Sequence, residues 1–198
     1  MADDERDQIL KAAFDLMTTP HGTAVSVQAI LQESGLSTRA FYRHFPSKDD
    51  LILTMYRTAA QRVIDELSAV VALADTDALA AFRQWVHQHF AVVYSQRRAR
   101  QTALLMSPEL RRVPGFEAVD QQTATARREL LAQVIRKGRE SGAFPLATDA
   151  DEDARAVISV MGGIMMAKIG GQAVPTWDDA AAHTTELFLR AFGCPTTT

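Results

Sequence analysis

Residues 37–48 read STRAFYRHFPSK, and this stretch decides what kind of fold the chain forms. It holds three basic and three aromatic residues and no acidic residue, although the chain of 198 residues has a formal net charge of −3. At helical periodicity Phe41 and Phe45 fall on one side, and Arg39 and Arg43 fall on another. We therefore expect a short helix with an apolar inner face and a basic outer face.

Serine residues precede three short helical segments in this part of the chain. The hydroxyl oxygens of Ser26, Ser37 and Ser47 stand where a side chain can accept a hydrogen bond from a first-turn amide. Gly35 separates the first two segments, at a turn that requires the left-handed conformation glycine adopts without steric cost. Two short helices joined in this way predict a helix-turn-helix, whose second helix enters the major groove of DNA.

The stretch SVQAILQESGLSTRAFYRHFPSKDDLILTMY, residues 26–56, resembles the helix-turn-helix region of the TetR family of transcriptional regulators. The resemblance is specific over about residues 9–56, where FYRHF followed by PSK is the most recognisable part. Beyond that range it is architectural. It implies a surface that binds DNA. The residues that would contact phosphates are Tyr42 and Lys48, and secondarily Ser26 and His44. The residues that would contact bases are Thr38, Arg39 and Arg43, and secondarily Gln28, and Ser37 belongs to the same surface.

The rest of the chain has the pattern of an all-α protein. Ala, Leu, Gln, Glu and Arg dominate the segments between glycine and proline breakers, and strand-like alternation is nearly absent. We expect about nine helices, in a helix-turn-helix three-helix module over residues 1–50 and a helical bundle domain over residues 51–198. A connecting helix begins at about residue 47. Capping residues predict the starts of the last two helices at Asp149 with Glu152 and at Thr176 with Asp179.

The resemblance implies that residues 51–198 dimerise, commonly through the last two helices. In GGIMMAKIGG, small residues recur every four positions, which favours close approach of another helix because glycine inside a helix costs about 1 kcal/mol relative to alanine. The residues expected at a homodimer interface are Gly163, Ala167, Gly171, Thr184, Leu187, Phe188 and Ala191.

The resemblance also implies that this domain binds a small-molecule effector. Aromatic, imidazole and thioether side chains mixed into apolar helix faces suit such a site, although ordinary core packing is the alternative for each of them. We expect an apolar or aromatic effector. The candidate ligand-binding residues are Trp85, His89, Phe90, Tyr94, Met106, Met161 and Met165.

Composition and spacing argue against several other classes of protein. The net charge of −3 excludes binding to nucleic acid through bulk charge alone. Cys194 is the only cysteine, which excludes an internal disulfide and predicts a reducing, cytoplasmic setting. The longest apolar run is too short to span a membrane and contains Lys168. His87 and His89 point about 200° apart on a helix, so we expect no metal site. The sequence contains no catalytic or cofactor-binding motif, so we expect that the protein has no cofactor and is not an enzyme.

The sequence therefore predicts a ligand-responsive transcriptional regulator. The most direct form is a repressor that binds a pseudo-palindromic double-stranded DNA operator as a homodimer and is released by its effector. The alternative is a helix-turn-helix architectural or interaction protein without a small-molecule effector. A cavity in the C-terminal domain would favour the first hypothesis, and a filled domain would favour the second.

Overall fold

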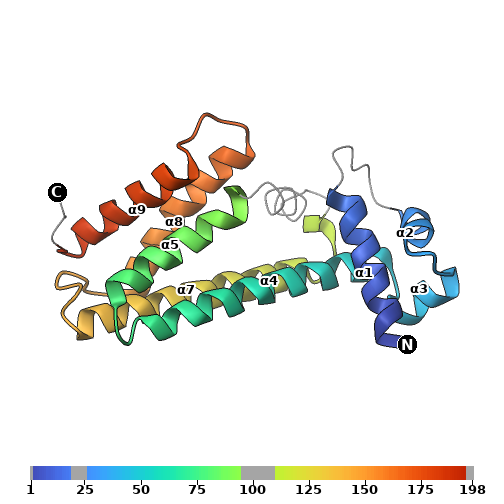
Figure 1. Ribbon diagram of the computed structural model, residues 1–198, viewed down its shortest axis with the longest axis horizontal. Coiled ribbons are helices and arrows are strands. Elements are labelled where there is room, and N and C mark those ends of the chain that lie inside the picture. The colour runs from blue at the N-terminus through green and yellow to red at the C-terminus, as the bar shows by residue number, and fades with distance from the viewer. Residues whose placement is uncertain (1, 19–25, 95–109, 195–198) are drawn as a thin grey trace. The chain divides into compact units, whose positions relative to one another are not determined.

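The computed structural model describes residues 2–18, 26–94 and 110–194, and the statements below refer to these ranges (Figure 1). Its elements are α1 (Ala2–Thr18), α2 (Val27–Ser34), α3 (Thr38–His44), α4 (Lys48–Leu73), α5 (Ala78–Tyr94), the 3-10 turn η1 (Leu110–Arg112), α7 (Phe116–Glu140), α8 (Ala150–Ile169) and α9 (Trp177–Ala191). The expected all-α fold is confirmed. The helix expected over about residues 99–106 lies outside the described residues.

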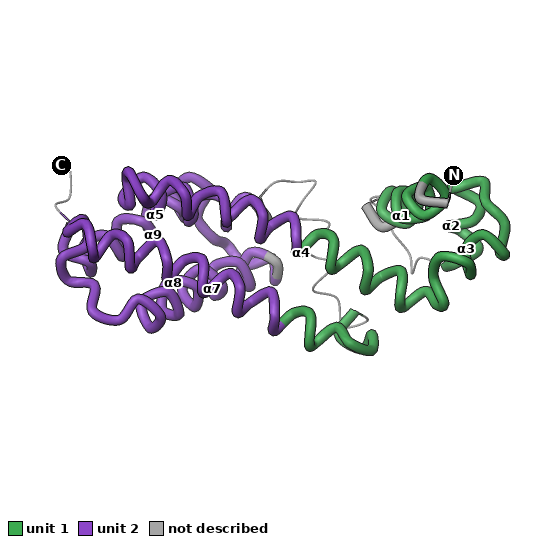
Figure 2. The backbone as a smooth tube through the Cα atoms, turned by 90° about the horizontal axis from the view of Figure 1, so that it is seen from below, with its two compact units in different colours: residues 1–60, 100–120 green, residues 61–99, 121–198 purple. Residues whose placement is uncertain are grey.

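The chain packs as two compact units, residues 1–60 with 100–120 and residues 61–99 with 121–198 (Figure 2). The boundary therefore falls inside α4 and again inside α7, whereas the sequence predicts a boundary near residue 50. The physical reason is a small apolar cluster within unit 1 that joins the first part of α4 to η1 and the start of α7. Its buried members are Leu53, Tyr56, Leu110, Val113 and Phe116, and the Tyr56 hydroxyl donates a hydrogen bond to Asp120 Oδ1 at 2.6 Å.

The helix-turn-helix module of unit 1 has its own core. α1 lies against α2 and α3, and its residues Ile9 and Ala13 are buried where these helices meet. The core continues through Ile30 of α2 and through Phe41 of α3. Removing a side chain of this size from water contributes about 1.5–3 kcal/mol, so these few residues hold the three short helices together.

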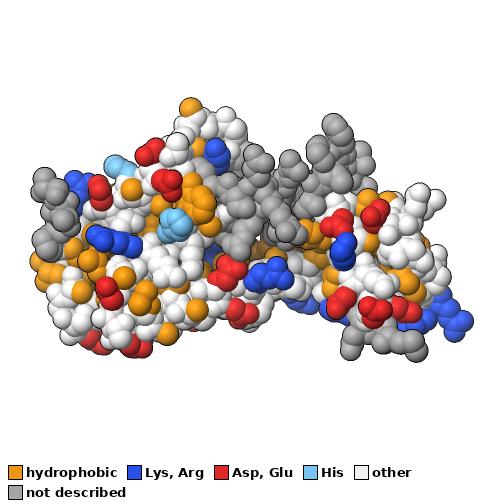
Figure 3. Space-filling model, viewed as in Figure 1, with side chains coloured by type: hydrophobic (Ala, Val, Ile, Leu, Met, Phe, Trp, Pro, Cys, Tyr) orange, Lys and Arg blue, Asp and Glu red, His pale blue; other side chains and the backbone are white. Residues whose placement is uncertain are grey.

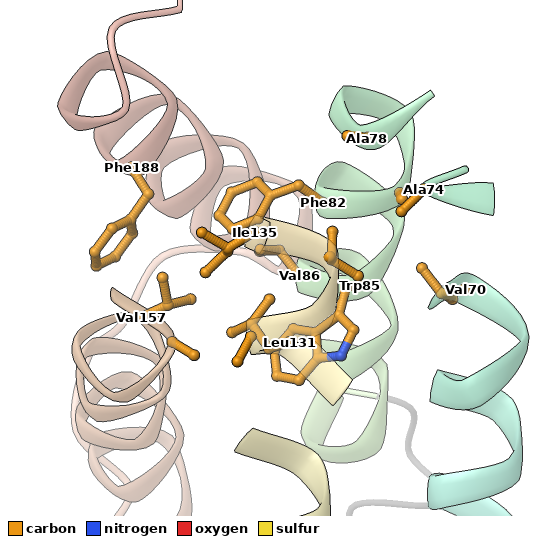
Figure 4. Close-up of a cluster of buried hydrophobic side chains, with 14 of the residues drawn as sticks. Val70, Ala74, Ala78, Phe82, Trp85, Val86, Leu131, Ile135, Val157 and Phe188 are labelled. Carbon is orange, nitrogen blue, oxygen red and sulfur yellow. The ribbon is translucent and has the colours of Figure 1, made fainter. Parts of the chain in front are cut away.

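Unit 2 is built around α5. Figure 4 shows Phe82, Trp85 and Val86 pointing from α5 toward α7, where Leu131 and Ile135 lie. The same apolar cluster extends to α4, α8 and α9, and α5 packs directly against α8 and α9. This core is where the candidate effector-binding side chains of α5 are located.

The sequence-predicted caps of the last two helices are confirmed. Asp149 Oδ1 accepts hydrogen bonds from the backbone N–H groups of Asp151 and Glu152, at 3.0 and 3.2 Å. Thr176 Oγ1 accepts one from Asp179 N at 3.3 Å. No helix in the described ranges combines the length and apolar character needed to cross a membrane.

Candidate nucleic-acid interface

Two serine caps and one glycine define the turn between α2 and α3. Ser26 Oγ accepts a hydrogen bond from Ala29 N at 3.1 Å, and Ser37 Oγ accepts one from Ala40 N at 3.2 Å. Gly35 ends α2 with φ of 68°, in the left-handed region that a Cβ would disfavour. Local chemistry therefore fixes where α3 begins and how it leaves α2.

The phenylalanines of α3 and of its C-cap both turn inward, as the periodicity predicts. Phe41 and Phe45 are buried, with ring centroids 5.9 Å apart. The ring of Tyr42 meets Phe41 edge-on at 5.3 Å, yet 54% of Tyr42 remains exposed. Thr38 and Arg39 are exposed on the first turn of the helix. The inner face thus anchors α3, and the outer face is accessible to DNA.

Lys48 lies at the start of the next helix. Ser47 Oγ accepts a hydrogen bond from Asp50 N at 3.1 Å, which caps α4, and Lys48 is the first residue of that helix. Its side chain is half-buried. A lysine fixed at a helix start can meet a phosphate, which sets the position of a protein on DNA without reading sequence.

Arg43 and His44, at the end of α3, both contact a carboxylate of α1. Arg43 Nη1 donates to Glu5 Oε2 at 3.1 Å, and His44 Nε2 lies 3.0 Å from the same oxygen. The hydrogen bond with His44, together with the positive charge of Arg43, lowers the pKa of Glu5. Only 10% of the His44 side chain is exposed, against 54% of Arg43, so Arg43 is much more accessible from outside.

The outer surface of the module is mixed in charge. On the side of unit 1 seen in Figure 3, acidic and basic side chains lie close together. An arginine such as Arg39 can make two parallel hydrogen bonds to guanine, worth about 1–3 kcal/mol of discrimination between bases. A tyrosine hydroxyl or a lysine contacts phosphates instead. The exposed residues of α3 therefore have the chemistry for both reading and positioning.

The comparison with known families decides the identity of this module. Residues 9–55 match the family model of the bacterial regulatory proteins, tetR family. Residues 9–55 are a DNA-binding module of the TetR type. The proteins of this family are transcriptional regulators and not enzymes.

A sequence relative of this chain is the nucleoid occlusion factor SlmA of Marinomonas sp. (strain MWYL1). The two are 32% identical over 76 residues, which are 35% of this chain and 39% of the relative. The match therefore spans well under half the length of that protein.

Solved structures resemble nearly the whole chain. A putative TetR-family transcriptional regulator from Mesorhizobium loti MAFF303099 superposes with a TM-score of 0.78 at 17% identity, covering 96% of both chains. A putative transcriptional regulator from Saccharomonospora viridis in complex with choline gives 0.77 at 24% identity, covering 93% of this chain and 95% of the other. At such identities the similarity confirms the TetR fold alone.

The candidate ligand-binding residues of α5 lie inside unit 2. Trp85 and Phe90 are buried, and the His89 ring stacks on Trp85 with centroids 5.0 Å apart. Burial, with a smaller contribution from the positive charge of Arg127, lowers the pKa of His89 to about 3, so its imidazole is neutral. Met161 is buried in the same core and Met165 packs against it. Met106 and the side chain of Tyr94 lie outside the described residues.

Some buried polar atoms of unit 2 have no hydrogen-bond partner within the described part of the chain. They include Trp85 Nε1 and Gln88 Oε1 on α5 and Thr184 Oγ1 on α9. A buried donor or acceptor without a partner costs about 1–3 kcal/mol, so such atoms are normally satisfied by water or by a ligand.

The residues expected at the dimer interface fall on two different faces. Thr184 and Phe188 are buried against the subunit's own core, because this side of α9 packs on α5. Leu187 is exposed, as is Ala191. On α8 the residues accessible to a partner include Gly163 and, partly, Ala167. Gly171 lies beyond the end of α8 with φ of 74°, where Gln172 N donates to Ala167 O at 3.0 Å, so this glycine serves to end the helix.

Sequence reasoning missed Glu5. It lies in an acidic N-terminal stretch and its partners are 38 and 39 residues away, so no local spacing connects them. The available signal was the register of α1: Glu5 precedes the buried Ile9 by four residues and therefore shares its side of the helix. The neighbouring Arg6 lies close to the C-cap residue of α3, with its guanidinium 5.7 Å from the centre of the Phe45 ring.

Proposed function

We propose that this TetR-family regulator is a repressor that binds a pseudo-palindromic operator as a homodimer and is released by a small effector. The observation that carries the proposal is the outer face of α3, where Thr38, Arg39 and Tyr42 are exposed while Phe41 and Phe45 anchor the helix. A two-fold dimer presents two such helices to half-sites about 34–36 Å apart. The expected operator therefore contains two inverted half-sites.

Selection from a pool of random duplexes tests the operator directly. The wild-type protein should enrich an inverted repeat, and footprinting should show protection of both half-sites. Arg39→Ala should weaken binding by about 1–3 kcal/mol and relax the preference at one base pair of each half-site. Lys48→Ala should weaken binding to all sequences similarly and flatten its salt dependence. Equal losses for Arg39→Ala on selected and random DNA would assign Arg39 to the backbone instead.

The interior of unit 2 supports an effector. Trp85 Nε1, Gln88 Oε1 and Thr184 Oγ1 are buried without partners in the described ranges, and a molecule with both donor and acceptor atoms would satisfy them. His89 is neutral when buried, so it can donate one hydrogen bond and accept another but supplies no charge. The stacked rings of Trp85 and His89 favour a planar, largely apolar effector.

The charge near His89 also bears on the class of effector. The regulator from Saccharomonospora viridis is in complex with choline, a quaternary ammonium cation. In this chain the Trp85 and His89 rings are buried and stacked, and His89 is neutral, so this pair supplies no negative charge to a cation. We therefore propose an aromatic molecule that is not a cation. A panel of aromatic acids, neutral aromatics and choline should change the Trp85 fluorescence of a Trp177→Phe variant only with the first two classes.

The outer faces of α8 and α9 support the homodimer. Val160, Met166 and Leu187 are large apolar side chains that remain exposed. A Cβ placed on Gly163 would meet no atom within 4 Å, so nothing within the subunit requires glycine there. Apolar side chains beside an open glycine suit the close packing of a second copy.

The sequence relative favours an alternative in which no small molecule takes part. The name of SlmA, nucleoid occlusion factor, describes a role other than response to an effector. In that case the chain would bind its operator unchanged in the presence of every aromatic compound that is tested. Operator release by any one compound would favour the repressor.

A further inference from the structure

We infer that Glu5 is a positioning residue for operator reading: it holds Arg43 on the outer face of α3 and so raises the preference for operator over other DNA. The inference rests on the proposed operator binding. It concerns a residue of α1, outside the helix-turn-helix itself.

A carboxylate of α1 joins this helix to the end of α3. A single oxygen, Glu5 Oε2, lies 3.1 Å from Arg43 Nη1 and 3.0 Å from His44 Nε2. His44 is largely enclosed, with 10% of its side chain exposed, so its nitrogen serves this contact from inside the module. The guanidinium of Arg6 over the Phe45 ring gives α1 a second contact at the same end of α3. Glu5 is therefore fixed with respect to the recognition helix.

The contact leaves Arg43 able to bind DNA. A guanidinium has five N–H donors in a planar fork, and the hydrogen bond to Glu5 is donated by Nη1. Arg43 remains 54% exposed, so other donors can reach a base edge. An arginine that is already held loses less rotamer freedom on binding than an unrestrained one. Glu5 thus lowers the entropic cost of a hydrogen bond from Arg43 to a base edge.

The same carboxylate weakens the non-specific contacts of Arg43 with DNA phosphates. Its negative charge beside Arg43 reduces the attraction of that guanidinium for phosphates, which dominates binding to non-operator DNA. A hydrogen bond from Arg43 to a base depends on alignment more than on net charge. The charge of Glu5 therefore weakens this bond less than it weakens a phosphate contact, and the fixed position of Arg43 strengthens it. The expected result is a higher ratio of operator affinity to non-specific affinity.

Two substitutions at Glu5 and one matched control test the inference. Glu5→Gln removes the charge and keeps an acceptor oxygen, and Glu5→Ala removes both. Asp7→Asn removes the same charge from an exposed position of α1. Fluorescence anisotropy with the full-length protein should measure Kd for the selected operator and for a scrambled duplex at several salt concentrations. Because both affinities come from one preparation, a smaller folded fraction changes them equally and leaves their ratio unaffected.

The Glu5 variants should lower the affinity ratio by about two- to fivefold for each half-site, the range expected for losing an exposed ion pair. The salt dependence of non-specific binding should steepen by about 0.9 per subunit as Arg43 turns to a phosphate. In an Arg43→Ala background, Glu5→Ala should not change the ratio further. An unchanged ratio, a change equal to that of Asp7→Asn, or a change that persists without Arg43 would each overturn the inference. If the wild-type protein enriches no sequence from the pool, the proposed operator binding itself fails.

Discussion

Gly138→Ala is a sharp test of how unit 2 is packed. Gly138 lies in α7 opposite the ring of Phe144, which comes from the turn that follows the helix. A Cβ at position 138 would lie 2.8 Å from Phe144 Cγ and closer still to the ring carbons Cδ2 and Cε2. Phe144 is buried and contacts Phe82 and Phe192, with centroids 5.9 and 5.3 Å away. The ring therefore cannot retreat without disturbing the core.

The expected magnitude follows from two opposing effects. Alanine in place of a helical glycine stabilises by about 1 kcal/mol. Overpacking of a buried site costs about 1–3 kcal/mol, and three ring carbons under 3 Å place this site at the upper end. The free energy of unfolding should fall by about 2 kcal/mol, which corresponds to a Tm about 4–8 °C lower for a chain of this size.

Urea unfolding and thermal melting measure this change, with Gly162→Ala as the matched control. A Cβ on Gly162, in α8, would meet no atom within 4 Å. The control should therefore show only the gain in helix propensity, about 1 kcal/mol, and a Tm about 2–4 °C higher. Stabilisation of both variants to the same degree would refute the reasoning, because the Phe144 ring would then yield freely.

Two further predictions concern unit 2. The pKa of His89 is lowered to about 3, so the unfolded chain takes up a proton below pH 6.5 that the folded chain does not, and stability falls as the pH drops. Between pH 7 and pH 5, urea unfolding should show the wild type losing about 2 kcal/mol more than His89→Leu, and equal losses would contradict a neutral buried imidazole. Leu187→Lys should convert the proposed dimer to monomer in sedimentation experiments, whereas Ala182→Lys, on the other exposed flank of α9, should not. A dimer that survives Leu187→Lys would place the interface elsewhere.

The helix-turn-helix could be predicted from sequence because its signals are local. Ser26, Ser37 and Gly35 act within three residues of the backbone groups they affect, and the inward side of α3 follows from the spacing of Phe41 and Phe45. Each signal acts on backbone or side-chain groups only a few residues away, so the neighbouring sequence is enough to recognise it. This is why both the faces and the ends of α3 agree with expectation.

The contacts that could not be predicted join distant parts of the chain. Glu5 meets the end of α3, and Tyr56 of α4 meets Asp120 of α7, across separations of 38 to 64 residues. The interface prediction shows a different difficulty. Leu187 and Phe188 are adjacent in one apolar stripe, and periodicity alone does not say which of them faces the subunit's own core. Only the position of α5 decides that Phe188 turns inward.

We propose α4 as the route by which the proposed effector acts on the proposed operator contact. The helix runs from Lys48 to Leu73, and its first part belongs to unit 1 and its last part to unit 2. Its last turns contribute Leu67 and Val70 to the core that contains Trp85, and its first turn carries Lys48. In this proposal the effector selects one of two packings of that core, and the operator selects the other. By linkage, the operator then weakens effector binding by the same factor as the effector weakens operator binding.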